Sequence, residues 1–300
     1  MIYRIQNELK EISSQQYSAD ELTLALLSED ELRADGNPLG LNTDCFTLKP
    51  FQINCSETEY MIYIRKINTD VESSQEDSIY IIIRKNLLAV IGCDNDTKEH
   101  FFRGVEKSKN VLTVEKLISN FLFSLTADDM KDLDGIEYRI SKSEDAILTG
   151  GKTDNINSEI LKIKRKLLRL RSFYEQISDI AEELVRNDIK LFADKKLKYF
   201  RDYIQSTDRL TSKVDILRES LVQLREAYQA SIDLKLNNTM KFFTVIATVF
   251  LPLTLITSWY GMNFVSMPEL RWRYGYIYVI ALSAAVAVGC IVWFKKKKFM

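Results

Sequence analysis

The sequence predicts an α+β protein in which an N-terminal α/β domain is followed by a long helical stalk and two C-terminal membrane helices. Strand-like apolar patterns are confined to the first third of the 300 residues. From residue 114 onward, apolar residues recur every three or four positions, the spacing of one helix face. Residues 242–260 and 274–294 contain no Asp, Glu, Lys, Arg or His. Each is long enough to cross a bilayer as a helix, which takes about 20 apolar residues.

The first domain, expected over residues 1–115, is a cytoplasmic α/β unit. Three segments carry the apolar pattern of strands: residues 60–67, 78–84 and 87–92. Lys85 and Asn86 separate the last two segments, and they predict a tight hairpin turn because Asn tolerates left-handed backbone geometry. Residues 22–32 suit a short helix, which we expect beside the strands.

A cytoplasmic helical hairpin is expected over residues 116–195. Its first helix covers residues 114–148 and ends before the glycine pair at 150–151. Its second helix begins near residues 157–158, an Asn-Ser pair suited to capping. The apolar face of this second helix predicts lengthwise packing against a neighbour and consists of Ile160, Ile163, Leu167, Leu170, Tyr174, Ile177, Ala181 and Leu184.

Residues 196–260 predict a stalk helix that continues into the first membrane span. Neither Pro nor Gly occurs between Asp194 and Lys241. A helix of this length measures roughly 100 Å at 1.5 Å per residue. Such a rod suits either mechanical coupling or a coiled-coil stalk that only holds a domain off the membrane. Its apolar seam is Leu210, Val214, Leu217, Leu221, Leu224 and Tyr228.

The distribution of basic residues predicts the orientation of the two spans. Lys235 and Lys241 precede the first span, and a cluster of lysines follows the second. The positive-inside rule then places both termini in the cytoplasm. We therefore expect a multi-pass protein of the cell (inner) membrane, with residues 261–273 as the extracytoplasmic loop, 274–294 as the second span and 295–300 as a basic cytoplasmic tail.

Two spans cannot enclose an aqueous path, so transport would require several copies around an axis. The first span carries more hydroxyls than the second. Hydroxyls in membrane helices also serve as contacts between helices, which is the alternative interpretation. One helical stripe places apolar constrictions between polar ends: Asn237, Met240, Phe243, Ala247, Leu251, Thr254 and Ser258.

The loop between the spans offers neutral oxygens to a cation. Gly261 allows the backbone to leave the helix or to approach an ion closely, and Asn263 presents a carboxamide oxygen. Mg²⁺ releases its inner waters reluctantly, so such oxygens suit the hydrated ion. At the outer mouth, Glu269 would raise the local cation concentration, which Arg271 and Arg273 partly offset.

Residues 237–276 resemble the end of the CorA family of magnesium transporters. The resemblance is carried by Tyr-Gly-Met-Asn at 260–263, by Met-Pro-Glu-Leu at 267–270 and by the closing lysines. It is close over about the last hundred residues, and the order of elements extends it loosely to the whole chain. Zinc-exporting relatives share the Gly-Met-Asn sequence, so Co²⁺, Ni²⁺ or Zn²⁺ stays open as the transported ion besides Mg²⁺.

The resemblance implies a funnel-shaped homopentamer whose first membrane helices line the pore along the stripe from Asn237 to Ser258. Phe243 and Leu251 would form hydrophobic constrictions that gate by dewetting. The selectivity loop falls on Gly261, Met262 and Asn263. A basic collar at the inner mouth falls on Lys295, Lys296, Lys297 and Lys298, although these lysines equally suit anchoring to anionic lipid headgroups.

The resemblance also implies closure by intracellular Mg²⁺ bound between carboxylates of neighbouring cytoplasmic domains. Asp202, in Phe-Arg-Asp, matches the stalk-side carboxylate. The N-terminal motif that supplies the partner is not intact here, and Asp44 is the candidate for it. A helix-capping role is the alternative for Asp44.

Other features favour a non-enzyme whose partners are divalent metal ions, the lipid bilayer and copies of itself. His100 lies in no catalytic motif, so we expect a surface side chain. A net charge of −1 argues against nucleic-acid binding. A membrane-tethered coiled-coil scaffold or sensor without transport is the alternative from another class. The four cysteines are scattered and predict neither a disulfide framework nor a zinc site: Cys45, Cys55, Cys93 and Cys290. Four aspartates predict a solvated acidic patch on a helix: Asp128, Asp129, Asp132 and Asp134.

Overall fold

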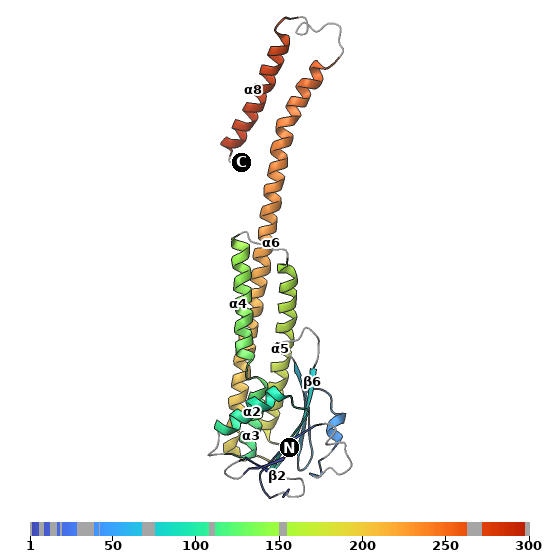
Figure 1. The fold of residues 1–300 in the computed structure, drawn as a ribbon, viewed down its shortest axis with the longest axis vertical. Helices are drawn as coiled ribbons and strands as arrows, with labels where there is room; N and C mark the ends of the chain where they lie inside the picture. Colours follow the sequence, from blue (N-terminus) through green and yellow to red (C-terminus); the bar gives the residue numbers. More distant parts are fainter. Residues whose placement is uncertain are drawn as a thin grey trace. The chain divides into compact units, whose positions relative to one another are not determined.

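The computed structural model describes most of the chain and divides it into two units. One unit comprises Met1–Leu224 and the other Arg225–Met300. Figure 1 traces the elements of both units in sequence colours. The described residues are 2–5, 9–12, 17–18, 20–28, 39–41, 43–67, 76–107, 112–149, 155–262 and 272–297.

The first unit contains a seven-stranded sheet with strand order β2-β1-β3-β7-β6-β5-β4. Strands β3 and β7 pair in parallel, and the other neighbouring pairs are antiparallel. The described strands are β1 (Ile2–Ile5), β2 (Leu9–Ile12), β3 (Thr23–Leu27), β4 (Gln52–Cys55), β5 (Tyr60–Ile67), β6 (Glu76–Arg84) and β7 (Leu87–Ile91). The three strands expected from the sequence correspond to β5, β6 and β7, and the hairpin turn at Lys85 and Asn86 is confirmed.

The expected helix over residues 22–32 is wrong, because this segment contributes β3 to the middle of the sheet. Leu24, Ala25 and Leu26 are all buried. A strand covered on both faces reads as a continuous apolar run, and periodicity alone does not separate such a run from a buried helix. Residues 29–32 lie outside the described part of the chain.

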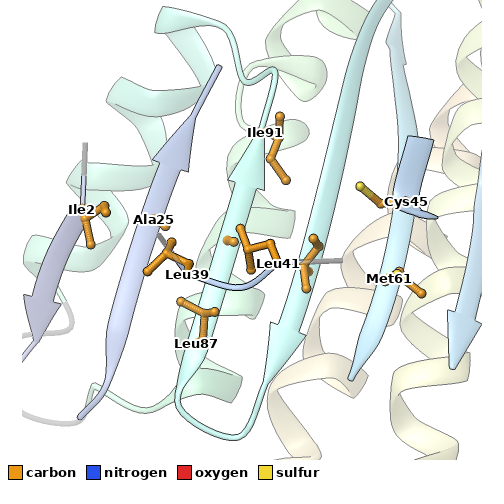
Figure 2. Close-up of a cluster of buried hydrophobic side chains, with 10 residues drawn as sticks. Ile2, Ala25, Leu39, Leu41, Cys45, Met61, Leu87 and Ile91 are labelled. Atoms are coloured by element: carbon orange, nitrogen blue, oxygen red, sulfur yellow. The ribbon is translucent and has the colours of Figure 1, made fainter. Parts of the chain in front are cut away.

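An apolar cluster covers one face of the sheet. Figure 2 shows Leu39, Leu41 and Cys45 lying against side chains of the strands. Cys45 belongs to the short 3₁₀ helix η2 (Thr43–Thr47), which packs on β5 and β6. Helices α3 and α5 contact β7 and β5 respectively. The sheet members of the cluster are Ile2, Ala25, Met61, Ile82, Leu87, Ala89 and Ile91.

The helical part of the first unit contains one break that the sequence pattern did not predict. Instead of one helix over 114–148, the chain forms α3 (Val114–Leu125) and α4 (Asp129–Leu148). Within the break, the Thr126 N–H donates to the Phe123 carbonyl, and Asp129 N–H donates to the Thr126 carbonyl. Thr and Asp compete with helical hydrogen bonding and favour helix ends, which accounts for the interruption.

A bundle of α4, α5 and the first part of α6 follows. Helix α5 (Ile156–Arg186) buries the apolar face expected from its spacing, and residues 210–224 of α6 (Lys198–Tyr260) bury most of the expected seam. Ion pairs tie the helices together: Lys213 to Glu137, Lys166 to Asp132 and Arg171 to Asp215. The acidic patch is therefore partly paired rather than only solvated. The described helices also include α2 (Asn95–Lys107) and η3 (Asp194–Lys196).

The second unit contains the end of α6 and the helix α8 (Gly275–Lys296). Both are long and apolar enough to cross a membrane, within the described residues. Pro252 lies inside α6 without ending it. The expected spans, residues 242–260 and 274–294, coincide with these helical segments.

Candidate ion-conducting site

The predicted pore stripe lies on the exposed side of α6. In the single chain, Met240, Phe243 and Leu251 are 65%, 60% and 71% exposed. The four other stripe residues, Asn237, Ala247, Thr254 and Ser258, are exposed as well. The structure thus brings all seven predicted positions onto one uncovered face of a continuous helix.

The opposite side of α6 is the side covered within the second unit. Its buried or half-buried residues follow three- and four-residue steps: Lys241, Val245, Val249, Pro252, Leu253, Ile256 and Tyr260. With 3.6 residues per turn, this set lies about half a turn around the helix from the stripe. A matching set on α8 is Gly275, Val279, Leu282, Ser283, Val286, Ala287, Cys290 and Phe294. Because α6 and α8 are the described helices of the second unit, we infer that these two faces cover one another, which leaves the stripe available to another copy or to water.

Hydroxyls along α6 donate to their own helix. The Oγ1 atoms of Thr244, Thr248 and Thr254 donate to carbonyl oxygens four residues earlier, at 2.8, 2.7 and 2.8 Å. Each hydroxyl proton is engaged, while lone pairs of the oxygen remain as acceptors. The exposed hydroxyl of Thr254 therefore offers a neutral acceptor, which suits a hydrated cation.

The predicted selectivity loop begins where α6 ends. The N–H of Gly261 donates to the Thr257 carbonyl at 2.9 Å. A Cβ at Gly261 would lie 3.0 Å from that same oxygen, closer than ordinary packing, so the tight approach favours glycine. Met262 follows and is 46% exposed. Asn263 and Glu269 lie outside the described residues.

The predicted collar lysines end α8. Lys295, Lys296 and Lys297 are exposed, and Lys298 lies outside the described residues. Lys295 and Lys296 occupy the last turn, where positive charge is favourable to the helix dipole. The ammonium of Lys297 lies 5.2 Å from the centre of the Trp293 ring. This contact holds the Lys297 ammonium against the Trp293 ring.

The predicted regulatory carboxylates lie on separate elements. Asp202 is exposed on α6, whose first turns pack on α3 through a ring contact of Tyr203 with Phe123 at 5.1 Å. Asp44 is exposed in η2, which contacts β5 and β6 instead. Figure 1 shows η2 and the start of α6 on different sides of the first unit. One chain does not bring these two carboxylates together.

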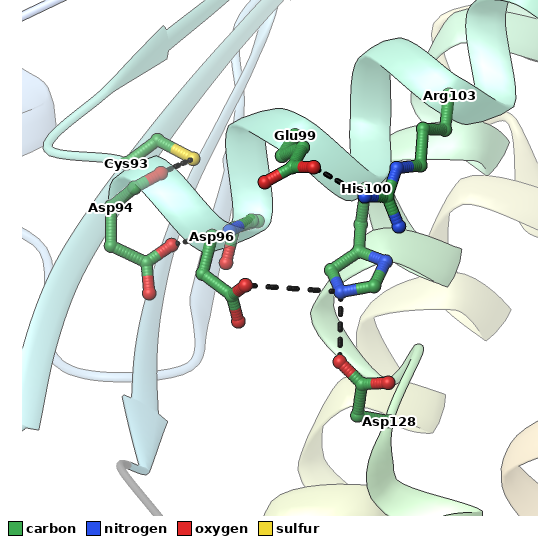
Figure 3. A network of polar contacts seen from close by, with 8 residues as sticks. Cys93, Asp94, Asp96, Glu99, His100, Arg103 and Asp128 are labelled. Carbon is green, nitrogen blue, oxygen red and sulfur yellow. Dashed lines mark hydrogen bonds and ion pairs between the residues drawn. The ribbon is translucent and has the colours of Figure 1, made fainter.

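His100, which we expect from the sequence to be a surface side chain, is partly exposed in the structure. Its ring is 22% exposed and contacts two carboxylates, Asp96 and Asp128 (Figure 3). The Asp96 to His100 spacing of four residues on one helix is a readable signal for such a contact. Asp128 comes from the break between α3 and α4, which the sequence analysis did not anticipate.

Comparison with known proteins places the chain in a family. The family model described as CorA-like Mg²⁺ transporter protein matches residues 49–296. The cobalt/magnesium transport protein CorA of Thermotoga maritima is 30% identical over 251 residues, which cover 80% of this chain and 70% of that protein. The putative metal ion transporter YfjQ of Bacillus subtilis is 33% identical over 140 residues, 47% of this chain and 44% of that protein.

Solved structures share the fold. The CorA magnesium transporter from Methanocaldococcus jannaschii superposes with a TM-score of 0.85 at 20% identity, covering 100% of this chain and 98% of that one. The full-length CmaX protein gives a TM-score of 0.74 at 15% identity, covering 99% and 96% respectively. Together with the match of the family model, these likenesses show that the chain belongs to the CorA-like Mg²⁺ transporter family.

Proposed function

We propose that this protein is a passive divalent-cation channel of the cell membrane that takes up Mg²⁺. The observation that carries the proposal is the stripe of seven exposed residues on α6, opposite the face covered by α8. The stripe has polar ends and apolar positions between them, and it leads directly to Gly261. The named functions of the relatives, transport of magnesium, cobalt or metal ions, support the same class of cargo.

The conducting unit in this proposal is a homopentamer. One chain provides two candidate membrane helices, and two helices enclose no aqueous path. Five copies of the α6 stripe around an axis would supply a closed wall, with α8 on the outside. Phe243 and Leu251 then form rings of apolar side chains, where dewetting interrupts conduction.

Neutral oxygens select the ion in this pore. The carboxamide of Asn263 and the backbone at Gly261 and Met262 hold hydrated Mg²⁺ through its water shell without trapping it. Glu269 concentrates cations at the outer mouth. The lysines at 295–298 form a positive collar at the inner mouth. Both termini are cytoplasmic in this arrangement.

Intracellular Mg²⁺ closes the pore by binding between Asp202 of one copy and Asp44 of its neighbour. The ion relieves the repulsion between the carboxylates of adjacent first units. The uninterrupted helix from Lys198 to Tyr260 supports mechanical transmission from this contact to the pore stripe. Loss of the ion allows the copies to separate and the constrictions to hydrate.

Mg²⁺ uptake into liposomes tests this function. The purified chain is reconstituted, and entry of Mg²⁺ is followed with an internal indicator dye. We expect saturable uptake that Co²⁺, Ni²⁺ or Zn²⁺ reduces in proportion to its affinity for the pore. Liposomes that contain the protein but take up Mg²⁺ no faster than empty ones would refute transport and favour a membrane-tethered scaffold.

A further inference from the structure

Three side chains of the first unit bring metal-ligating atoms close together. The Nε2 atom of His100 lies 2.7 Å from Oδ2 of Asp128 and 3.9 Å from Oδ1 of Asp96 (Figure 3). One ligand atom from each residue lies within 4.8 Å of the others. We propose that Asp96, His100 and Asp128 form a binding site for a transition-metal dication such as Zn²⁺ or Co²⁺.

The fold fixes the two halves of this cluster independently of any metal. Asp94 begins α2 by accepting the Thr97 N–H at 2.9 Å, which sets the first turn that carries Asp96. Helix α2 packs on α3 through Phe101 and Phe121, whose fully buried rings lie 5.8 Å apart. Since Asp128 follows α3 directly, this packing holds its carboxylate beside the imidazole of α2.

Asp128 departs from the usual behaviour of a residue at its position. It precedes the first turn of α4, where an Asp side chain normally accepts a backbone N–H. Its carboxylate makes no such cap and contacts His100 instead. The Asp128 carboxylate is therefore oriented toward the cluster, where it provides a charged ligand. It accepts no backbone N–H at the start of α4.

The distances suit a small adjustment to metal coordination. Zn²⁺ binds His nitrogen and carboxylate oxygen at about 2.0–2.2 Å, so two ligand atoms in a tetrahedral site lie roughly 3.3 Å apart. The two distances from His100 Nε2 bracket that value. Rotation of the exposed Asp96 and Asp128 side chains, 71% and 58% accessible, is sufficient to equalise them.

The charge and the type of the ligand atoms determine which metal ions the site prefers. In the described part of the chain, the nearby Glu99 pairs with Arg103, whereas Asp96 and Asp128 share one imidazole as their basic partner. Two carboxylates and a neutral imidazole attract a dication. An imidazole nitrogen suits Zn²⁺, Co²⁺ and Ni²⁺, whereas Mg²⁺ favours all-oxygen sites. Water completes the coordination on the exposed side.

A proton competes with the metal for the same atoms. The short contact between His100 and Asp128 is also the geometry of an imidazole N–H donating to a carboxylate. Metal binding must displace that proton from Nε2. Co²⁺ binding distinguishes a metal site from a permanent hydrogen bond. In a metal site, Co²⁺ replaces the proton on Nε2 of His100, whereas in a permanent hydrogen bond that proton stays.

Co²⁺ titration of the full chain in detergent tests the proposal, with excess Mg²⁺ present to saturate all-oxygen sites. His100 is the single histidine of the sequence, so a tag-free protein offers one imidazole. We expect one Co²⁺ per chain by calorimetry, with visible absorption typical of bound Co²⁺. His100→Ala and Asp128→Asn should each weaken binding at least about 10-fold, as loss of even an outer-shell partner weakens metal sites by about 10–100-fold.

Glu99→Gln is the matched control, because Glu99 is an exposed acid on the same helix and pairs with Arg103. This variant should bind Co²⁺ with the affinity of the parent. Circular dichroism establishes that each variant is folded. Absence of Co²⁺ binding in the parent, or unchanged affinity in folded His100→Ala and Asp128→Asn, would overturn the proposal. Binding in detergent needs no flux, so the result is independent of the proposed transport function.

Discussion

The backbone N–H of Gly261 donates to the carbonyl oxygen of Thr257, 2.9 Å away, at the end of α6. The contact leaves no ordinary space for a side chain, because a Cβ would lie 3.0 Å from that oxygen. The helix end and the first residue of the proposed selectivity loop are therefore set by the same close approach.

Gly261→Ala should impair Mg²⁺ uptake for this reason. The added methyl group must displace the Thr257 carbonyl and with it the start of the loop. An added barrier of about 1.4 kcal/mol reduces the rate about 10-fold, and we expect a loss of at least that order in liposome uptake. Gly289→Ala is the matched control, since a Cβ there meets no atom within 4 Å. Equal uptake by both variants would contradict the role of the turn.

A polar substitution at Phe243 should weaken closure. Phe243→Ser places a hydroxyl in the proposed apolar ring and keeps it hydrated, so uptake should rise several-fold at Mg²⁺ concentrations that close the parent. The adjacent Phe242 is the same residue type, is 61% exposed against 60% for Phe243, and points about 100° away around the helix. Phe242→Ser should therefore keep normal closure. A leak in Phe242→Ser and none in Phe243→Ser would place the constriction elsewhere.

Removal of the Asp202 carboxylate should change the response to intracellular Mg²⁺. Asp202→Ala is expected to raise the closing concentration of Mg²⁺ at least about 10-fold, the loss common when metal-site groups are removed. Protease protection by Mg²⁺ in detergent measures this shift. Asp208→Ala alters another exposed acid of α6 on a different face and should leave the protection curve unchanged. A parental curve for Asp202→Ala would remove Asp202 from regulation.

The cysteines should differ sharply in reactivity. Burial raises the pKa of the Cys45 thiol to about 11 from its ordinary 9.0, and the side chain is fully enclosed. Cys55 is exposed. Because only the thiolate is nucleophilic, alkylation at pH 8 followed by peptide mapping should modify Cys55 and spare Cys45 in the folded chain. Comparable labelling of both would contradict the packing of η2 on the sheet.

The raised pKa of Cys45 also predicts how the stability of the folded chain changes with pH. The pKa of Cys45 is higher in the folded chain than in the unfolded chain, so its contribution to stability is complete below pH 9.0. It declines as the pH rises toward about 11, since the unfolded chain loses this proton first. Urea unfolding midpoints at pH 7 and pH 10 should differ less for Cys45→Ala than for the parent.

The sequence predicted those parts of the fold whose signals are local and long. The apolar spacing of α5, the continuous apolar run of β5 and the uncharged spans each extend over several residues or more, so one local pattern is enough to predict each of them. Residues 23–27 form a strand because β1 and β7 pair with the two edges of that strand. This pairing depends on distant residues, so a local sequence pattern does not predict it. The break after α3 likewise arises from a few polar residues within a long helical pattern.

The candidate sites divide in the same way. The α6 stripe follows from helix geometry alone, and its role in conduction stays a prediction. The cluster at His100 depends on tertiary packing, because Asp128 reaches the imidazole only when α2 lies against α3. Asp44 and Asp202 belong to elements that one chain keeps apart, so their proposed pairing concerns the assembly.

The proposed assembly has a direct readout in mass. A complex near five times 34.8 kDa, measured in detergent by light scattering with the detergent contribution subtracted, is expected for the conducting form. A monomer or dimer lacks enough α6 helices to surround an aqueous path. The mass of a monomer or dimer, measured under conditions that preserve Mg²⁺ uptake, would contradict the homopentamer.

Mg²⁺ uptake through single-cysteine chains tests most directly whether the α6 stripe faces the ion path. In a background without the four natural cysteines, Ser258→Cys lies on the stripe and Ile256→Cys lies on the face covered by α8. A water-soluble, positively charged thiol reagent should block uptake through Ser258→Cys and leave Ile256→Cys conducting. Block at Ile256→Cys with unaffected uptake through Ser258→Cys would contradict the proposed path.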